Sequence, residues 1–302
     1  MNKKMRANLL LLLTAMIWGA SFVFQVSGME HVGPITFQGI RLLFAAAVLV
    51  PVVIIMNKGK GPLFAPEKKE ENKNILFGGI CCGLALFAAR ILQQFGCVFT
   101  TAGKAAFITT LYVVIVPIFS LFLRKRVRPI MWVCVVLGVI GLYLLAMPNG
   151  FGSVSKGDFF VILCAVAFAV HIMVCDHFVA KNDGVKLSLI QFLTAGILGC
   201  ILMFIFETPN FDDILNCAIP ILYAGCLSGG VGYTLQIVAQ RDAEPTVASL
   251  LMSLESVFGV LFGALLLHEV MSGREIIGCC TIFAAVIISN LPEKQVKLKD
   301  VY

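Results

Sequence analysis

The chain is poor in charged residues. Of its 302 residues, only 13% are Asp, Glu, Lys or Arg, whereas 59% are hydrophobic. A soluble globular protein has about 25% charged and about 45–50% apolar residues. Apolar runs of about 20 residues recur along the chain, and runs of that length are typical of membrane-spanning helices. The composition therefore predicts an all-α polytopic membrane protein and excludes an ordinary soluble domain.

Sequence signatures of catalysis and cofactor binding are also missing. There is no phosphate-binding loop, no metal-ligand spacing and no Ser/His/Asp order that indicates nucleophilic catalysis. The eleven cysteines form no CxxC motif, and most lie in apolar runs, where a thiol is a small apolar filler. We therefore expect no enzyme activity, no cofactor, no metal site and no disulfide framework. The cations lie in short loops between apolar runs, which argues against nucleic-acid binding.

The apolar runs predict ten transmembrane helices. Each run can cross about 30 Å of hydrocarbon at about 1.5 Å per residue. Pro34, Pro129 and Pro245 occupy first-turn positions, where proline is tolerated, and Pro148 and Pro292 follow helix ends. The basic N-terminus leads into the first run without a small-residue cleavage site, so we expect an uncleaved first helix. The predicted spans are residues 9–27, 34–56, 75–95, 102–123, 130–147, 158–178, 186–206, 214–238, 246–267 and 275–291.

Lysine and arginine are unevenly distributed between the two sides of the predicted membrane. With the N-terminus inside, eighteen of them lie in inside segments, and only Lys156 and Arg274 lie in outside loops. Cytoplasmic loops carry such an excess. We therefore predict a multi-pass protein of the plasma or inner membrane with both termini in the cytoplasm. The longest polar stretch, residues 57–74, is then expected to be a mobile cytoplasmic loop.

The two halves of the chain resemble each other weakly but in order. An offset of 150 residues places Trp18 on Phe168, and an offset of 143 places Tyr112 on Glu255. Because each half has five predicted helices, the second half enters the membrane from the opposite side. Inverted repeats of this kind occur in secondary transporters, where two bundles move around a central site. The predicted arrangement is a first five-helix repeat at 1–148, a linker at 149–157, a second five-helix repeat at 158–292 and a cytoplasmic tail at 293–302.

Charged residues at membrane depth are the first candidates for a site. Glu255 lies near the middle of its predicted span, where an unpaired carboxylate is either protonated or needs a cation. It could bind a substrate amine, carry a proton or form a structural hydrogen bond. Arg41, Arg90 and Lys104 lie within a turn or two of the predicted outer boundary. They could form a positive vestibule for a carboxylate, or each could reach the interface separately.

Neutral polar and aromatic residues complete the candidate site. Each could line a substrate cavity or serve helix packing, as His171 and the repeat-related pair Gln93 and Gln236 illustrate. Pro117 and the glycine-rich residues 228–232 could be hinges or packing kinks. The predicted substrate-binding residues are Trp18, Ser21, Arg41, Gln93, Lys104, Tyr112, His171, Gln236 and Glu255.

Five short motifs point to a known family. They are Ile17-Trp-Gly-Ala-Ser-Phe, Arg41-Leu-Leu-Phe, Thr101-Ala-Gly-Lys-Ala-Ala-Phe-Ile-Thr-Thr-Leu-Tyr, Gln236-Ile-Val-Ala-Gln and Ser253-Leu-Glu-Ser-Val-Phe. Together they resemble EamA-type members of the drug/metabolite transporter superfamily over nearly the whole chain. The resemblance implies two inverted five-helix repeats in a bacterial inner membrane. It also implies a central cavity lined mainly by helices 1, 3, 4, 6, 8 and 9, and small-metabolite substrates, often amino acids, that are commonly exported.

Two departures from the family pattern matter. Ser256 replaces the proline that usually follows the glutamate, which puts a kink after Glu255 in doubt. His268 and Glu269 stand where the family more often has Gly-Glu.

The sequence therefore predicts a secondary transporter that works by alternating access around a mid-membrane cavity. We expect it to export a small polar metabolite such as an amino acid or a derivative, with the bilayer and the substrate as partners and proton coupling as one option. No ATP-binding motif is present, so a gradient would drive transport. The alternatives are an exporter of apolar cationic drugs, a membrane enzyme acting on a lipid-linked substrate, and a receptor without transport.

Overall fold

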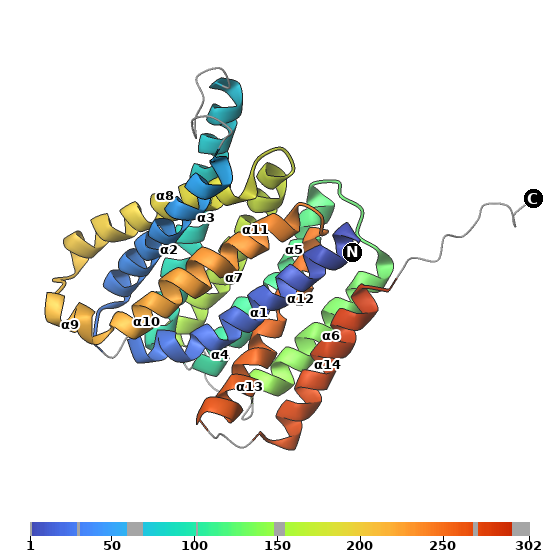
Figure 1. Cartoon of the computed structure of the whole chain (residues 1–302). Helices are drawn as coiled ribbons and strands as arrows, with labels where there is room; N and C mark the ends of the chain where they lie inside the picture. Colours follow the sequence, from blue (N-terminus) through green and yellow to red (C-terminus); the bar gives the residue numbers. More distant parts are fainter. Residues whose placement is uncertain are drawn as a thin grey trace, which may run out of the picture.

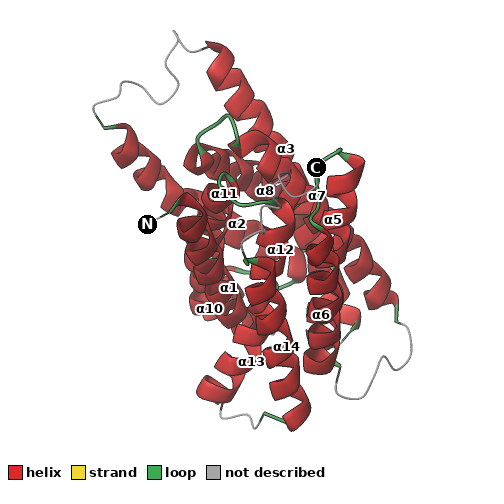
Figure 2. Ribbon diagram, turned by 90° about the vertical axis from the view of Figure 1, so that its right-hand side faces the viewer, coloured by secondary structure: helices red, strands yellow, loops and turns green. Residues whose placement is uncertain are grey.

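A computed structural model describes residues 2–28, 31–58, 69–100, 102–147, 155–267 and 271–291. These residues form helices joined by turns, and no strand occurs among them (Figures 1 and 2). Eight helical segments of the described chain are long and apolar enough to cross a membrane. The all-α polytopic prediction is therefore confirmed.

The number of ten spans stays a prediction. The first and last predicted spans correspond to α1 (Lys3–Gly28) and α14 (Gly273–Ser289), and neither is among those eight segments. α14 has 17 residues, which reach about 25 Å at about 1.5 Å per residue, short of the usual hydrocarbon thickness.

The order of the remaining elements follows the predicted spans closely. The first half continues with α2 (Pro34–Asn57), α3 (Lys69–Phe99), α4 (Ala102–Thr110), α5 (Tyr112–Phe122) and α6 (Pro129–Ala146). The second half contains α7 (Lys156–Val179), α8 (Gly184–Phe206), α9 (Phe211–Asn216), α10 (Ala218–Leu222), the π-helix η2 (Tyr223–Tyr233), α11 (Thr234–Gln240), α12 (Pro245–Met252) and α13 (Leu254–Leu267) before α14.

Helix starts have the predicted chemistry. Pro34, Pro129 and Pro245 each occupy the first turn of their helix, as predicted. Ser155 caps α7, because its side chain accepts a hydrogen bond from the Asp158 backbone N–H and the Asp158 side chain accepts one in return. α7 consequently begins at Lys156, inside the stretch that was predicted as a linker. Pro148 and Pro292 lie outside the described residues.

Part of the predicted loop at 57–74 is helical. Residues 59–68 lie outside the described chain, but α3 already begins at Lys69. Glu70 and Glu71 occupy its first turn, where carboxylates favour the positive end of the helix dipole. Lys73 lies 2.9 Å from Glu70 on the same face. Local helix chemistry therefore extends α3 beyond its apolar run.

Two predicted spans are interrupted by a single residue well inside the span, in addition to the break at Cys217 between α9 and α10. Leu111 separates α4 from α5, and Ser253 separates α12 from α13. At both points the backbone tightens to bonds between residues three apart, such as the Ser256 N–H donating to the Ser253 carbonyl at 3.2 Å. The helix therefore changes just before Glu255, although residue 256 is not proline.

Hydroxyl side chains at these interruptions bond back to the preceding turn. The Thr110 Oγ1 donates to the Ala106 carbonyl at 2.7 Å, and the Ser253 Oγ donates to the Leu250 carbonyl at 2.7 Å. Such bonds from Ser or Thr back to the preceding turn bend helices. The interruptions come one residue before Tyr112 and two residues before Glu255.

The glycine-rich segment at 228–232 forms part of η2 and packs closely on α2. A Cβ atom at Gly225 would lie 2.7 Å from the Arg41 backbone oxygen, and one at Gly229 would lie 2.8 Å from the Ala45 Cβ. No side chain fits there without a shift of backbone. Close helix packing is therefore a sufficient reason for Gly225 and Gly229.

The helices pack in pairs across the two halves. α3 packs on α7 and α8, α2 packs on α8 and η2, and α1 packs on η2, α11 and α13. α6 and α14 lie side by side at the edge of the bundle (Figure 1). Glycines allow the backbones to meet in two of these pairs, because Cβ atoms at Gly39 and Gly199, or at Gly141 and Gly278, would lie within 3 Å of the partner backbone.

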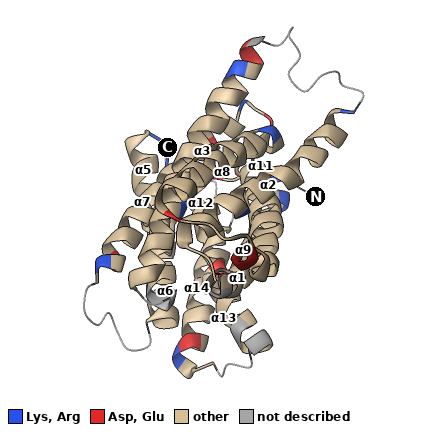
Figure 3. Ribbon diagram, turned by 90° about the vertical axis from the view of Figure 1, so that its left-hand side faces the viewer, with Lys and Arg blue, Asp and Glu red and all other residues tan. Residues whose placement is uncertain are grey.

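The start of α1 and the end of α14 lie at one end of the bundle, which we term the terminal end. The Asn8 Nδ2 donates to the Asn290 Oδ1 at 2.6 Å. Most of the ribbon carries no charge, and Lys, Arg, Asp and Glu occupy few positions on it (Figure 3). Large apolar side chains cover the outside, with Phe122 80% and Phe204 73% exposed. Such a surface suits contact with lipid.

Candidate functional site

A narrow cavity lies in the middle of the bundle. Its free volume is about 30 Å³, which is room for about two water molecules. The lining residues come from the first, third, fourth, sixth, eighth and ninth predicted spans, the set that the family resemblance implied. They are Trp18, Ser21, Gln25, Arg90, Gln93, Thr109, Tyr112, Phe168, His171, Ile172, Ser228, Tyr233, Gln236, Met252 and Glu255.

Seven of the nine predicted substrate-binding residues line this cavity. Two do not: Arg41 lies outside the lining set, and the side chain of Lys104 lies outside the described residues. The seven are Trp18, Ser21, Gln93, Tyr112, His171, Gln236 and Glu255. That they bind a substrate stays a prediction.

Glu255 is the carboxylate of the cavity. It is 7% exposed and lies in the first turn of α13. The Tyr112 Oη donates to its Oε1 at 3.3 Å, so the two repeat-related residues meet across the cavity. Within the described chain no cation lies within 4 Å of it. The carboxylate is therefore held by one neutral donor rather than by an ion pair.

Arg90 is the cation of the cavity. It is 5% exposed, and its Nη1 donates to the Gln93 Oε1 at 2.6 Å. Its guanidinium carbon lies 5.9 Å from the centre of the Tyr233 ring, within the range of a cation–π contact. Its Nε has no hydrogen-bond partner in the described structure. Arg90 therefore has donor capacity left for an anionic group.

Aromatic rings gather around Tyr233. Its ring centre lies 4.5 Å from that of Trp18, 5.9 Å from that of His171 and 5.8 Å from that of Phe192. The Trp18 Nε1 donates to the Ser228 carbonyl at 3.1 Å, which ties α1 to η2. A π-helix often marks a functional site, and here it places Ser228 and Tyr233 in the cavity wall.

Of the two ring nitrogens of His171, one has polar partners in the described structure and the other has none. Its Nε2 lies 3.0 Å from the Gln191 Oε1 and 3.3 Å from the Cys175 Sγ. Its Nδ1 is buried without a partner among the described residues. His171 therefore makes the core hydrogen bond that its position in the sequence allowed. Its Nδ1 is still available for another hydrogen bond.

Several buried polar atoms of cavity residues lack a hydrogen bond. Within the described part of the chain they are the Ser21 Oγ, Arg90 Nε, His171 Nδ1 and Gln236 Oε1. Buried polar groups in native proteins are nearly always paired with protein or water. Their concentration around one cavity indicates a place where water or a ligand binds.

Two of the three predicted vestibule cations lie inside the bundle. Arg41 is 1% exposed and Arg90 is 5% exposed, so neither side chain extends separately to the surface of the bundle, and the vestibule itself stays a prediction. Helix packing explains the difference, because α2 lies against α8 and η2 at Arg41, and α3 lies against α7 and α8. Both guanidinium groups belong to the interior of the bundle.

Sequence reasoning missed half of the cavity wall. It considered Arg90 but did not include it, and it did not single out Tyr233 or Thr109. The repeat contained a signal for Phe168, because that residue aligns with Trp18. Tyr233 follows the glycine-rich segment, which gave no indication of the direction in which its ring would point.

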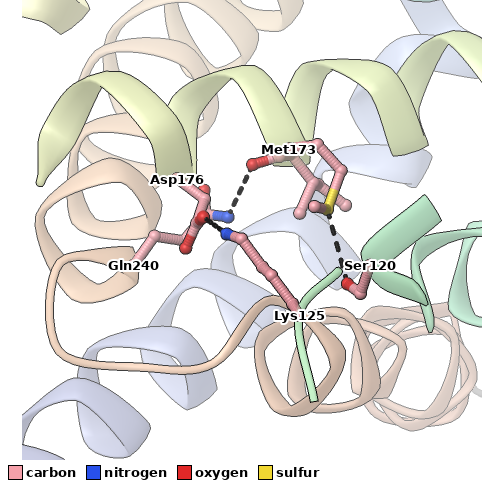
Figure 4. A network of polar contacts seen from close by, with 6 residues as sticks. Ser120, Lys125, Met173, Asp176 and Gln240 are labelled. Atoms are coloured by element: carbon pink, nitrogen blue, oxygen red, sulfur yellow. Dashed lines mark hydrogen bonds and ion pairs between the residues drawn. The ribbon is translucent and has the colours of Figure 1, made fainter. Parts of the chain in front are cut away.

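Polar contacts continue from the cavity toward the terminal end. The Gln236 Nε2 donates to the Gln240 Oε1 at 3.1 Å, and the Gln240 Nε2 donates to the Ile172 carbonyl at 3.0 Å. One turn further along α7, Asp176 forms an ion pair with Lys125 of the α5–α6 turn (Figure 4). Gln25, three residues before the end of α1, lies on the other side of the cavity.

Comparison with known proteins identifies similar chains. The EamA-like transporter family matches residues 5–147 and again residues 155–291. An uncharacterized transporter of Archaeoglobus fulgidus is 29% identical over 96% of this chain and 87% of its own. The uncharacterized transporter YoaV of Bacillus subtilis is 23% identical over 89% and 92%. A solved crystal structure with 17% identity superposes with a TM-score of 0.80 over 96% of this chain and 98% of its own, which shows a shared fold.

Proposed function

Because the chain belongs to the EamA-like transporter family, we propose that it is a gradient-driven exporter of a small polar metabolite, with an amino acid or a derivative as substrate. One observation carries the substrate proposal. Arg90 and Glu255 line the same buried cavity, and no ion pair joins them. The family and its relatives are named as transporters, which favours transport over an enzyme acting on a lipid-linked substrate.

A zwitterion suits these two side chains. Buried charges without partners are costly, because the desolvation of each ion is not offset by a nearby opposite charge. An ammonium group at Glu255 and a carboxylate at Arg90 would pair both at once. Arginine binds carboxylates through two parallel hydrogen bonds, and the free Nε of Arg90 is available for such a contact.

The packing of the helices supports two inverted five-helix repeats. α3, the third span of the first half, packs on α7, the first span of the second half. α1, the first span of the first half, packs on η2 and α11, which form the third span of the second half. The same pairing therefore occurs with the halves exchanged. The pairs α2 with α8 and α6 with α14 join equivalent helices. The family matches each half once. With the terminal end in the cytoplasm, as the excess of Lys and Arg favours, both termini are cytoplasmic.

Substrate binding requires a conformational change in this arrangement. The cavity has room for about two waters, and an amino acid is larger. The contacts among Gln236, Gln240 and Ile172 continue from it toward the terminal end. We infer that the bends before Tyr112 and Glu255 and the ion pair at the terminal end change when the cavity opens to the cytoplasm.

Reversing one charge of the Lys125–Asp176 pair is expected to slow transport about two- to fivefold, and reversing both is expected to restore it. Their side chains are 41% and 13% exposed, and pairs near the surface contribute about 0.2–1 kcal/mol. The measurement is counterflow for Lys125→Asp, Asp176→Lys and the double variant, treated as a double-mutant cycle. Lys181→Asp is the matched control. A double variant no faster than the slower single variant would remove this pair from the contacts that change when the cavity opens.

Counterflow in proteoliposomes tests the proposed function. Vesicles containing the full chain are loaded with a pool of unlabelled amino acids and then given the labelled forms, with a pH gradient imposed or collapsed. We expect labelled amino acid to accumulate above the level in protein-free vesicles. Dependence on the gradient would add proton coupling. Folded protein that moves no member of the pool contradicts the proposal.

Export of an apolar cation is the second candidate. The Trp18 and Tyr233 rings, 4.5 Å apart beside Glu255 in the cavity, provide the aromatic faces that an organic cation prefers. In this case labelled quaternary ammonium compounds would show counterflow, and amino acids would not.

A further inference from the structure

A second buried guanidinium lies beside the cavity. Arg41 of α2 is 1% exposed, and its guanidinium carbon lies 5.7 Å from the centre of the Phe37 ring. Its Nε and Nη1 are buried without a hydrogen-bond partner in the part of the chain that the structure describes. A buried arginine that leaves donors unused is costly, since these donors lose their hydration and gain nothing in return.

Arg41 lies on a helix that packs against the cavity wall. One turn before it, the Gln38 Nε2 donates to the Gln94 Oε1 at 2.5 Å, next to the cavity residue Gln93. The same helix, α2, packs on η2, which carries Tyr233 of the cavity wall. Glu255 is the one carboxylate among the described lining residues. Among the described side chains, the two guanidinium groups and this carboxylate leave one positive charge in excess in a medium of low dielectric constant, where repulsion is strong.

Resting on the proposed function, we propose that the substrate carries two anionic groups and one ammonium group, as an aminodicarboxylate does. Its ammonium group binds Glu255 and one carboxylate binds Arg90. The second anionic group binds Arg41 once the cavity widens. A substrate of net charge −1 then neutralises the site, and each of the three charged side chains has one partner.

Isosteric substrate pairs test this proposal. Glutamate and glutamine, like aspartate and asparagine, have nearly the same shape and differ by one negative charge. In counterflow with the full chain we expect the acids to be taken at least about tenfold better than their amides, because one hydrogen-bonded charge contributes about that much. In Arg41→Gln we expect this acid-to-amide ratio to fall at least about tenfold. The matched control is Arg241→Gln, an exposed residue at the end of α11.

The outcomes separate this proposal from the proposed function. Equal transport of acids and amides by the unaltered chain, or an unchanged ratio in folded Arg41→Gln, contradicts the assignment of Arg41 while amino-acid transport stands. A lack of counterflow for acids and amides alike contradicts both. Arg41→Gln is expected to fold, since replacement of an unpaired buried charge by a neutral group is usually tolerated. Should it fail to fold, the ratio is measured in Arg41→Lys, which keeps the charge and loses the paired donors.

Discussion

Replacing Glu255 with Gln is expected to reduce counterflow of the substrate about 30-fold or more. The substitution keeps the size of the side chain and its contact with the Tyr112 Oη but removes the negative charge. Loss of one partner of a buried, hydrogen-bonded charge pair costs about 2 kcal/mol or more, which is about 30-fold. The measurement is the initial rate of labelled uptake in proteoliposomes at matched protein density.

The same variant is expected to be no less stable than the unaltered chain. In the described structure Glu255 has a neutral donor and no ion pair, so a neutral amide removes an unfavourable buried charge. Its thermal unfolding in detergent would check this. Glu244→Gln is the matched control, since Glu244 is exposed at the start of α12 and makes no side-chain cap. Unchanged transport in Glu255→Gln would leave Glu255 as a structural residue.

Replacing Arg90 with Gln is expected to remove the preference for a substrate carboxylate. In the unaltered chain, an amino acid whose carboxyl group is amidated should compete at least about tenfold more weakly than the amino acid itself, because it lacks the anionic partner of Arg90. In Arg90→Gln both compounds should compete equally weakly. The measurement is inhibition of labelled counterflow by each unlabelled compound.

Arg90→Lys separates charge from geometry. Lysine keeps the positive charge but cannot form the paired hydrogen bonds of a guanidinium, so we expect an intermediate preference. Arg241→Gln controls for a lost surface cation. If Arg90→Gln keeps the full preference for the free carboxylate, another cation binds that group, and the pairing of Arg90 with Glu255 in one site is wrong.

Much of the fold could be predicted because the bilayer restricts the chain. Backbone groups in hydrocarbon must bond within their own segment, so each long apolar run has to be a helix. Pro34, Pro129 and Pro245 marked helix starts for the same local reason. Two features were not predicted, because the distribution of apolar residues does not indicate them. They are the helical start of α3 at Lys69 and the one-residue interruptions at Leu111 and Ser253.

The site was only partly predictable, since depth in the membrane says nothing about neighbours. Glu255, Tyr112 and Gln236 were found because polar groups at that depth are rare and need a reason. Arg41 and Arg90 looked equivalent in sequence, yet Arg90 lines the cavity and Arg41 lies behind its wall. Tyr233 looked like any aromatic residue of an apolar span.

The sequence by itself determined that this chain is a helical membrane protein with a few polar residues at membrane depth, because the hydrophobic effect acts on each segment separately. Only the tertiary structure decided which of these residues meet. The contact between Tyr112 and Glu255, the tilted contact between the Trp18 and Tyr233 rings and the Arg41 donors without a partner in the described structure each depend on which helices become neighbours. That choice is made by packing between segments far apart in the chain, where small residues let particular backbones approach.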